Sequence, residues 1–439
     1  MSADRYVVLG LAHVRSTWFT EVARWATVGS LPLEFVKCVS AEQLRARLAG
    51  GQPFSAALVD ARLTTVDRDL LATIAHRGTS VLVVEQAGSP TDWVALGAAA
   101  VLDAPLEREG LLDALTAHCS PIDPLDGGAH LTTAPDLADA GWRSPMIAVV
   151  GRGGAGTSTI AAALSQGLAA DPRHGTDVVL ADLARHAHQA LLHDARDVVP
   201  GLQDLVEAHR SGRPSTADIR GLTFEVPDRG YRLLLGLRSP HDWLALRSAA
   251  FTAALAGLRR STRFLVTDCD DDLEGEADTG SLDIEDRNLA ARHATSQADL
   301  VIVVARPNAT GLFDLVRLLA DLDAHGVDPG RTLVAINHAP RRPRLRAELA
   351  RTVAELCSSS GSGPGHAGLV FVPERRAIDD LHRDLAVLPN ALVVPITAAA
   401  GAALDRVGTR TAADLQDPCS AVPVAPGSLG SWPDADDEN

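Results

Sequence analysis

The most constraining feature of the sequence is a glycine-rich run between a strand-like and a helix-like segment. Residues 146–150 read MIAVV and residues 151–159 read GRGGAGTST, followed by an alanine-rich stretch. Glycine permits the positive φ angles of a tight loop and lets backbone N–H groups approach a ligand. The N-terminus of the next helix adds unpaired N–H groups and a positive dipole end. The run predicts an anion-binding loop, with Ser158 placed to ligate Mg²⁺ or cap the helix.

Two classes of ligand fit this loop. Gly151, Gly153 and Gly156 match the G-x-G-x-x-G pattern of dinucleotide-binding loops, which also needs an acidic residue about 20 positions later. Asp182 lies 26 positions after Gly156 (182 − 156), farther than that pattern expects. A dinucleotide-dependent enzyme therefore stays open beside a nucleoside triphosphate loop, although the sequence offers no evident catalytic constellation for it.

The rest of the chain alternates short apolar runs with amphipathic stretches, which predicts βα units and parallel sheets. Five such units predict a flavodoxin-like domain over residues 1–120, and a linker over 121–145 leads to a larger α/β domain over 146–412. Residues 413–439 have the composition of a disordered acidic tail. The strands expected in the larger domain cover residues 146–150, 177–181, 232–235, 263–267, 300–305, 332–336, 369–372 and 392–396.

Charge and composition argue against several function classes. The formal net charge of −16 disfavours direct binding to nucleic acid or anionic lipid, since affinity for phosphate comes from clustered Lys and Arg. We expect no membrane insertion, because no run of eighteen apolar residues is present. The charged start of the chain does not read as a signal peptide, which indicates the cytoplasm.

Three further clusters invite a functional interpretation but favour a structural one. His186, His188 and His193 alternate as metal ligands can, yet nothing completes a ligand set, so a polar loop or helix edge is the better interpretation. The acidic residues 270–276 are typical of a solvated loop. The arginine-rich residues 340–346 lack aromatic side chains for stacking on bases, and we interpret them as a partner contact or a solvated turn.

Taken in order, these motifs resemble the MinD/ParA superfamily of deviant P-loop ATPases, whose loop reads approximately K-G-G-x-G-K-[ST]-[ST]. Residues 152–159 follow that loop, with Arg152 at the signature lysine and Thr157 at the phosphate-loop lysine. Strand-like runs that end at Asp182, Asp268 and Asn337 match the family in the same order. The resemblance implies a P-loop domain with a mostly parallel sheet that binds ATP and Mg²⁺.

The resemblance also implies a role for each matched residue. Ser158 and Asp268 would hold Mg²⁺, and Asp182 would position water in an active enzyme. A homodimer would form through the nucleotide face, with Arg152 as the cross-dimer contact. The residues implied to bind nucleotide are Arg152, Gly153, Gly154, Ala155, Gly156, Thr157, Ser158, Thr159 and, at the adenine, Asn337.

The chain departs from the family at the loop cation. Thr157 replaces the lysine, and Lys37 is the only lysine in the sequence, so no lysine of the larger domain can substitute for it. Charge stabilisation of the transition state in phosphoryl transfer is worth roughly 10³–10⁵ in rate when an arginine finger supplies it. We therefore expect weakened nucleotide binding and slow or absent hydrolysis. The alternative is an active ATP-driven dimerisation switch that uses Arg152 in place of lysine.

Residues 1–120 resemble a response-regulator receiver, and the combination with a MinD-like domain resembles the CpaE/TadZ group. Asp60 ends the third strand-like run, where receivers place the phosphoacceptor. The other receiver features are missing: residues 10–13 read GLAH instead of an acidic pair, 84–86 read VEQ instead of a Ser or Thr, and Ala104 replaces the lysine before Pro105. We therefore expect a pseudo-receiver that serves docking or dimerisation, with Asp60 a degenerate phosphoacceptor position.

Within that group the chain resembles the actinobacterial CpaE-like branch described as septum-site-determining (Ssd) proteins, which occur beside secretion or tight-adherence pilus components. The resemblance implies a spatial regulator of septum placement, or of a Flp/tad-type pilus or secretion assembly, with proteins of those systems as partners. MinD ends in a basic amphipathic helix that binds membranes, whereas this chain ends in acidic residues that anionic lipid would repel. Recruitment to the septum or pole would then occur through partners.

Overall fold

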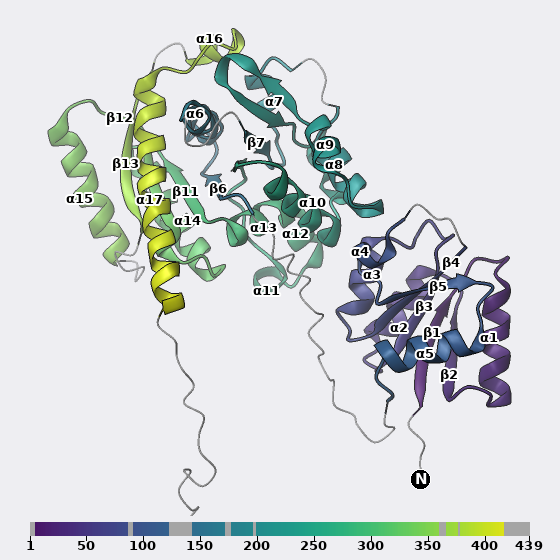
Figure 1. Cartoon of the computed structure of the whole chain (residues 1–439). Helices are drawn as coiled ribbons and strands as arrows, with labels where there is room; N and C mark the ends of the chain where they lie inside the picture. Colours follow the sequence, from purple (N-terminus) through teal and green to yellow (C-terminus); the bar gives the residue numbers. More distant parts are fainter. Residues whose placement is uncertain are drawn as a thin grey trace, which may run out of the picture.

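The computed structural model describes residues 5–86, 91–122, 143–171, 177–195, 199–359, 366–375 and 378–416. They form an N-terminal unit (residues 5–122) and a larger unit (residues 143–416), each built on one sheet (Figure 1). The linker and tail expected over 121–145 and 413–439 lie largely outside the described residues. An α/β fold with mostly parallel sheets, as the alternation of strands and helices predicts, is confirmed.

The N-terminal unit holds five parallel strands in the order β2-β1-β3-β4-β5, which is the order of flavodoxin-like sheets. Helices α2, α3 and α4 cover one face, and α1 and α5 cover the other. The elements are β1 (Tyr6–Leu11), α1 (Thr17–Val28), β2 (Leu33–Cys38), α2 (Ala41–Ala49), β3 (Ala56–Asp60), α3 (Arg68–Ala75), β4 (Ser80–Gln86), α4 (Trp93–Leu96), β5 (Ala100–Ala104) and α5 (Arg108–His118).

The larger unit holds eight strands in the order β13-β12-β11-β6-β10-β7-β9-β8, with only the β8–β9 pair antiparallel among the described strands. The strands are β6 (Met146–Val150), β7 (Val178–Asp182), β8 (Phe224–Val226), β9 (Tyr231–Leu234), β10 (Phe264–Asp268), β11 (Leu300–Ala305), β12 (Thr332–Ala339) and β13 (Gly368–Pro373). The helices are α6 (Thr157–Ala170), α7 (Gln189–Leu192), α8 (Leu202–Ser211), α9 (Thr216–Gly221), α10 (Ser248–Ser261), α11 (Glu276–Thr279), α12 (Leu282–Arg287), α13 (Leu289–Gln297), α14 (Ala309–Ala324), α15 (Pro343–Ser359), α16 (Ile378–Arg383) and α17 (Asn390–Gln416).

Both faces of the larger sheet are covered, which is why its central strands are continuous apolar runs rather than alternating ones. Every residue of β6, β7, β10 and β11 is buried. Helices α8, α10, α13 and α14 enclose one core, and α6 and α17 enclose the other. The central position of β6 places the loop that follows it at the middle of the sheet's carboxyl edge.

The prediction of a strand at residues 392–396 is wrong, because this segment lies within α17. The run is rich in Val and Ile and resembles a strand. Its buried residues Leu392, Val393 and Ile396 are followed by Ala400 and Ala403, which is the three-to-four residue spacing of a helix. The short edge strand β8 had no sequence signal, since three residues are too few to show a period.

Helix α17 contains a stretch, Asn390–Gly408, that is long and apolar enough to cross a membrane. We expected no segment able to cross a membrane. Judged by length and composition alone, this stretch does not meet that expectation. In the structure this helix packs along α6 and β13 (Figure 1). Some core helices of soluble proteins meet the same criterion, but those are mostly buried, whereas 28% of this stretch is buried.

The close approach of α17 to α6 depends on Gly167, where an added Cβ would collide with the Thr397 hydroxyl. We expect Gly167→Ala to lower the free energy of unfolding by about 1–3 kcal/mol, the usual cost of overpacking. Gly401 on α17 meets nothing within 4 Å of its added Cβ, so Gly401→Ala should be neutral or stabilising. Chemical denaturation of both variants checks this, and equal stability of the two would contradict it.

Candidate functional site

The glycine-rich loop between β6 and α6 takes the conformation that its glycines predict. Gly154 has φ 78° and Gly156 has φ 90°, both in the left-handed region that side chains avoid. Ala155 N–H donates to the Arg152 carbonyl at 2.9 Å, which closes the turn. At Gly151 an added Cβ would lie 2.5 Å from the Val304 carbonyl oxygen of β11, so only glycine fits at the start of the loop.

Asn337 supports the loop from β12. Its side-chain amide donates to the Ala155 carbonyl at 2.8 Å and leaves no room for a side chain at Gly156. Asn337 is buried, so in this structure its amide serves the loop. Its implied contact with adenine stays a prediction.

Two buried carboxylates lie side by side below the loop. Asp182 ends β7 and Asp268 ends β10, and the two residues are paired in register across these neighbouring strands. Burial raises the pKa of Asp268 to about 6, although hydrogen bonds from Ser158 and Gln189 oppose the rise. Burial, and then the charge of Asp268, hold the pKa of Asp182 well above its usual range. A cation would relieve both effects.

Gln189 at the start of α7 connects these groups and was not predicted from the sequence. Its side-chain Nε2 donates to Asp268 Oδ2 at 2.8 Å and to the Ser158 carbonyl at 3.1 Å. Its backbone N–H donates to Asp182 Oδ2 at 2.8 Å. The side-chain Oε1 is buried with no hydrogen-bond partner in the structure. A lone glutamine seven positions after Asp182 gives no sequence signal of this role.

The donor set fits a magnesium-bound nucleotide. Mg²⁺ prefers oxygen ligands and is usually held by one or two carboxylates together with substrate phosphates. Ser158 and Asp268 supply such oxygens, and the Ser158 side chain is hydrogen-bonded to Asp268. Added Cβ atoms at Gly153 and Gly154 meet nothing within 4 Å, so the loop has open space before it. Across the described ranges, no group of three or more His, Cys, Asp or Glu side chains could hold a metal by itself.

Arg152, the only cation of the loop, pairs with Asp271 of the same chain at 2.8 Å, while 38% of its side chain remains exposed. The neighbouring acidic residues are paired as well. Asp270 contacts Arg185 at 2.9 Å, and Asp272 contacts Arg287 at 2.8 Å. The expectation of a purely solvated acidic loop is therefore wrong at these three aspartates, because arginines distant in sequence neutralise them.

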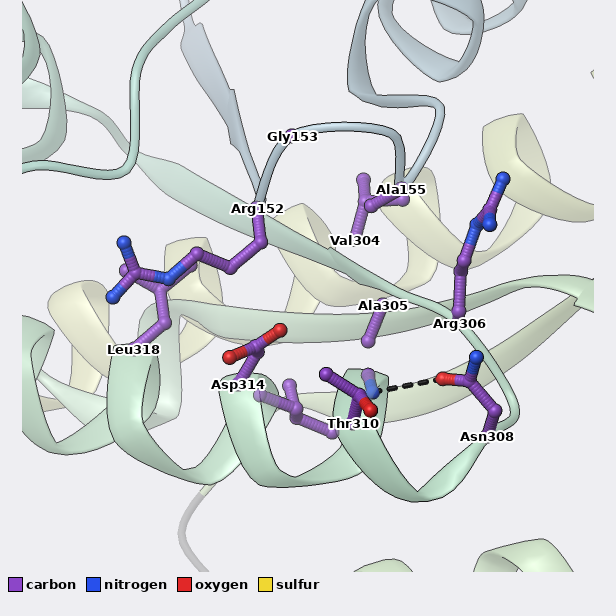
Figure 2. Close-up of a pocket in the computed structure, with 12 residues that line it drawn as sticks. Arg152, Gly153, Ala155, Val304, Ala305, Arg306, Asn308, Thr310, Asp314 and Leu318 are labelled. Carbon is purple, nitrogen blue, oxygen red and sulfur yellow. Dashed lines mark hydrogen bonds between the residues drawn. The ribbon is translucent and has the colours of Figure 1, made fainter.

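A cavity of about 280 Å³ lies beside the loop, on the side of β11 and α14. Figure 2 shows Arg152 and Gly153 on the loop above it, and Asn308, Thr310 and Asp314 at the start of α14 below. Its walls combine the cations Arg152 and Arg306 with an apolar floor, and the cavity opens beside the glycine-rich loop. The residues that line it are Arg152, Gly153, Ala155, Val304, Ala305, Arg306, Asn308, Thr310, Gly311, Asp314, Leu315 and Leu318.

The three histidines after β7 do not come together as metal ligands. His186 and His188 are exposed, whereas His193 is buried. The imidazole of His193 lies 2.7 Å from the Tyr231 hydroxyl and 2.8 Å from the Gln189 carbonyl. Burial lowers the pKa of His193 to about 4, so the ring is neutral at pH 7 and holds α7 in place.

Asp60 ends β3 and is fully enclosed by its own neighbours. Arg62 donates to both carboxylate oxygens at 3.1 Å, and the Ser16 hydroxyl also contacts the carboxylate. Burial would raise the pKa of Asp60, but the hydrogen bonds from Arg62 and Ser16 outweigh it and hold this pKa at about 2. The carboxylate is thus neutralised from within the chain.

No family model and no curated protein matches the chain. Among solved structures, it is similar to a ParA family ATPase from Chlorobium tepidum TLS, with 12% identity over 60% of this chain and 98% of that chain and a TM-score of 0.42. It is similar to the cell division ATPase MinD of Pyrococcus furiosus, with 20% identity over 61% and 99% of the two chains and a TM-score of 0.41. The septum site-determining protein MinD of Pyrococcus horikoshii OT3, complexed with Mg-ADP, shares 19% identity over 63% and 99%, with a TM-score of 0.41.

The bridge made by Gln189 predicts how metal and stability are linked. We expect Gln189→Leu to lower the free energy of unfolding by about 1–3 kcal/mol, because the buried Asp268 carboxylate loses a donor. Mg-ADP should raise the melting temperature of this variant more than that of the wild type, since the metal supplies the missing positive charge. Thermal denaturation with and without Mg-ADP measures both effects.

A matched control exists in Gln166, whose buried side chain bonds to the backbone of Leu388 at 2.8 and 2.9 Å. Gln166→Leu should cost similar stability without any added response to Mg-ADP. An equal response of the two variants would show that Gln189 has no special relation to the metal position.

Protonation of His193 should destabilise the protein in mild acid. Its folded-state pKa of about 4 lies below the unfolded value of about 6.5, so the stability it contributes is complete above about pH 6.5 and is lost as the pH falls toward 4. Between pH 7 and pH 5 the wild type should lose about 2 kcal/mol more than His193→Gln. Urea denaturation at both pH values tests this, with the exposed His186→Gln as control; parallel losses in wild type and His193→Gln would refute it.

Proposed function

We propose that this chain is a CpaE/MinD-like spatial regulator with a degenerate ATP-binding loop, which positions the division septum or a Flp/tad-type pilus or secretion assembly. One observation carries the proposal. The glycine-rich loop is followed by Ser158, which contacts Asp268 of the paired aspartates, and the first residue of α6 is Thr157 rather than a lysine. This arrangement supports a site that holds phosphates but lacks the cation that drives their transfer.

The same geometry separates binding from hydrolysis. Backbone N–H groups and the α6 dipole attract a phosphate in its ground state, and Mg²⁺ held by Ser158 and Asp268 would add charge neutralisation. The developing charge of the transition state needs a further cation near the transferred phosphoryl group. Thr157 cannot supply it, and Arg152 could supply it only after it leaves its pair with Asp271. Weak binding with little or no turnover follows.

We propose that the N-terminal unit is a pseudo-receiver. A receiver must neutralise an incoming phosphoryl group with Mg²⁺ and a lysine. Here Arg62 already neutralises Asp60, and Ser16 occupies one of its oxygens. A phosphoryl group at Asp60 would have to displace both contacts, so the unit serves protein contacts rather than phosphotransfer.

Self-association through the nucleotide face, in the cytoplasm, is part of the proposal. Division or pilus and secretion proteins would then recruit the chain to the septum or pole. The 38% exposure of the Arg152 side chain leaves it able to exchange Asp271 for a phosphate of a facing subunit.

A second candidate is an active ATP-hydrolysing dimerisation switch of the MinD/ParA type. The observation that favours it is the same half-exposed Arg152, which an incoming nucleotide could draw from Asp271. Asp182, beside Asp268, would position the attacking water in that mechanism.

Calorimetry and turnover assays with ATP, ADP and NAD distinguish these functions. We expect the wild type to bind Mg-ATP without measurable turnover, and Thr157→Lys to tighten binding about 10- to 150-fold, the equivalent of a charged hydrogen bond of ~1.5–3 kcal/mol. Ala324→Lys adds the same charge at the exposed far end of α14 and should leave affinity unchanged. Turnover by the wild type would favour the ATPase, and binding of NAD alone would exclude both candidates.

A further inference from the structure

The N-terminal unit contacts the larger unit through α3, which lies against α8 and α10. In Figure 1, α3 and α4 occupy the side of the N-terminal unit that faces these two helices. Three consecutive charged residues, Asp67, Arg68 and Asp69, make polar contacts with these helices. They were not singled out from the sequence.

Arg68 caps the C-terminal end of α8. Its Nε donates to the His209 carbonyl at 2.8 Å and its Nη2 to the Gly212 carbonyl at 3.3 Å. Its Nη1 donates to the Ala95 carbonyl in α4 at 3.2 Å. The last carbonyls of a helix lack partners within the helix and carry the negative end of its dipole. A cation from the other unit therefore satisfies the end of α8.

Asp69 caps the N-terminal end of α10. Its Oδ1 accepts a hydrogen bond from the backbone N–H of Ala249 at 3.0 Å. The N-cap residue of α10 is Arg247, whose side chain makes no capping hydrogen bond. The cap of α10 thus comes from the N-terminal unit. The cation Arg68 meets the C-terminal end of α8, and the neighbouring anion Asp69 meets the N-terminal end of α10.

Asp67 fixes the direction of α3 relative to this surface. Its Oδ1 accepts from Leu70 N–H at 2.9 Å and caps α3 itself. Its Oδ2 lies 3.3 Å from Arg210 Nη1 at the end of α8. The same carboxylate therefore starts α3 and joins it to α8.

We infer that the α8–α10 surface is the docking site of the α3 face of the N-terminal unit. This docking fixes the position of α10 and, through α10, the position of the strand that ends in Asp268. Helix α10 ends at Ser261 and β10 starts at Phe264, so a shift of α10 reaches the aspartate directly along the chain. An external protein that binds the α8–α10 surface must first displace the N-terminal unit. This inference goes beyond the proposed function, because it holds whether or not a nucleotide binds.

Hydrogen–deuterium exchange of the full chain tests the docking without any ligand. We expect Arg68→Ala to speed exchange in the last turn of α8, and Asp69→Ala to speed exchange of the Ala249 amide by about fivefold or more, the equivalent of the ~1 kcal/mol of a helix cap. Arg77→Ala and Asp113→Ala remove the same charges at exposed positions of the N-terminal unit and serve as matched controls. They should exchange like the wild type at both helix ends.

The strands β1–β5 report whether the N-terminal unit remains folded in each variant. Faster exchange at the ends of α8 and α10, with these strands still protected, supports the inference. Exchange at the two helix ends no faster than in the controls overturns it.

Arg210→Glu provides a second approach from the other side of the interface, because it leaves the N-terminal unit unchanged. It places a negative charge beside Asp67, and the Ala249 amide should exchange faster at low salt. Added salt should narrow the difference, since screening weakens the repulsion. If the Ala249 amide of Arg210→Glu exchanged at the wild-type rate at low salt, the docking would be contradicted even if the α3 variants unfold.

Discussion

The arrangement at the carboxyl edge of the larger sheet depends on two buried carboxylates at the ends of adjacent strands. Asp182 and Asp268 cannot both keep their charges at low cost in an apolar interior: burial raises the pKa of each carboxyl, and the charge of Asp268 raises that of Asp182 further. The structure meets this constraint with an amide, since Gln189 donates to both residues. Its position in turn fixes α7, and the neutral His193 holds α7 from behind.

In this chain arginine side chains neutralise the carboxylates, a role that arginine and lysine share in other proteins. The sequence has one lysine, Lys37, outside the larger unit, so guanidinium groups meet the acidic residues after β10 and the carboxylate of Asp60. A guanidinium is planar and binds carboxylates with two donors, as Arg62 does at Asp60. Such a pair neutralises a carboxylate with two directed hydrogen bonds.

Much of the fold could be predicted from the sequence, because the strands of a parallel sheet covered on both faces are continuous apolar runs. Prediction failed where a helix has the composition of a strand: residues 392–396 are apolar and three of the five are β-branched, and only the longer spacing through Ala403 shows a helix. It failed again at β8, which is too short to carry a pattern.

For the site, the loop and its two aspartates follow from spacing along strands. The partners of these residues do not. The ion pair of Arg152 with Asp271, the bridge by Gln189 and the contact of Arg68 with α8 join residues far apart in sequence or lacking any motif. Pairings of this kind depend on how loops and helices pack, and a single sequence holds no record of that packing.

The contact between Asn337 and the glycine-rich loop has a consequence for the binding of a ligand there. Residue His338 has φ 53°, and the pairing of β12 with β13 shifts register at this point. The irregular strand end turns the Asn337 amide toward the Ala155 carbonyl. A ligand would therefore meet a loop whose conformational freedom was already lost on folding. Pre-organisation of this kind lowers the entropic cost of association, and it gives a loop without lysine a source of affinity that owes nothing to charge.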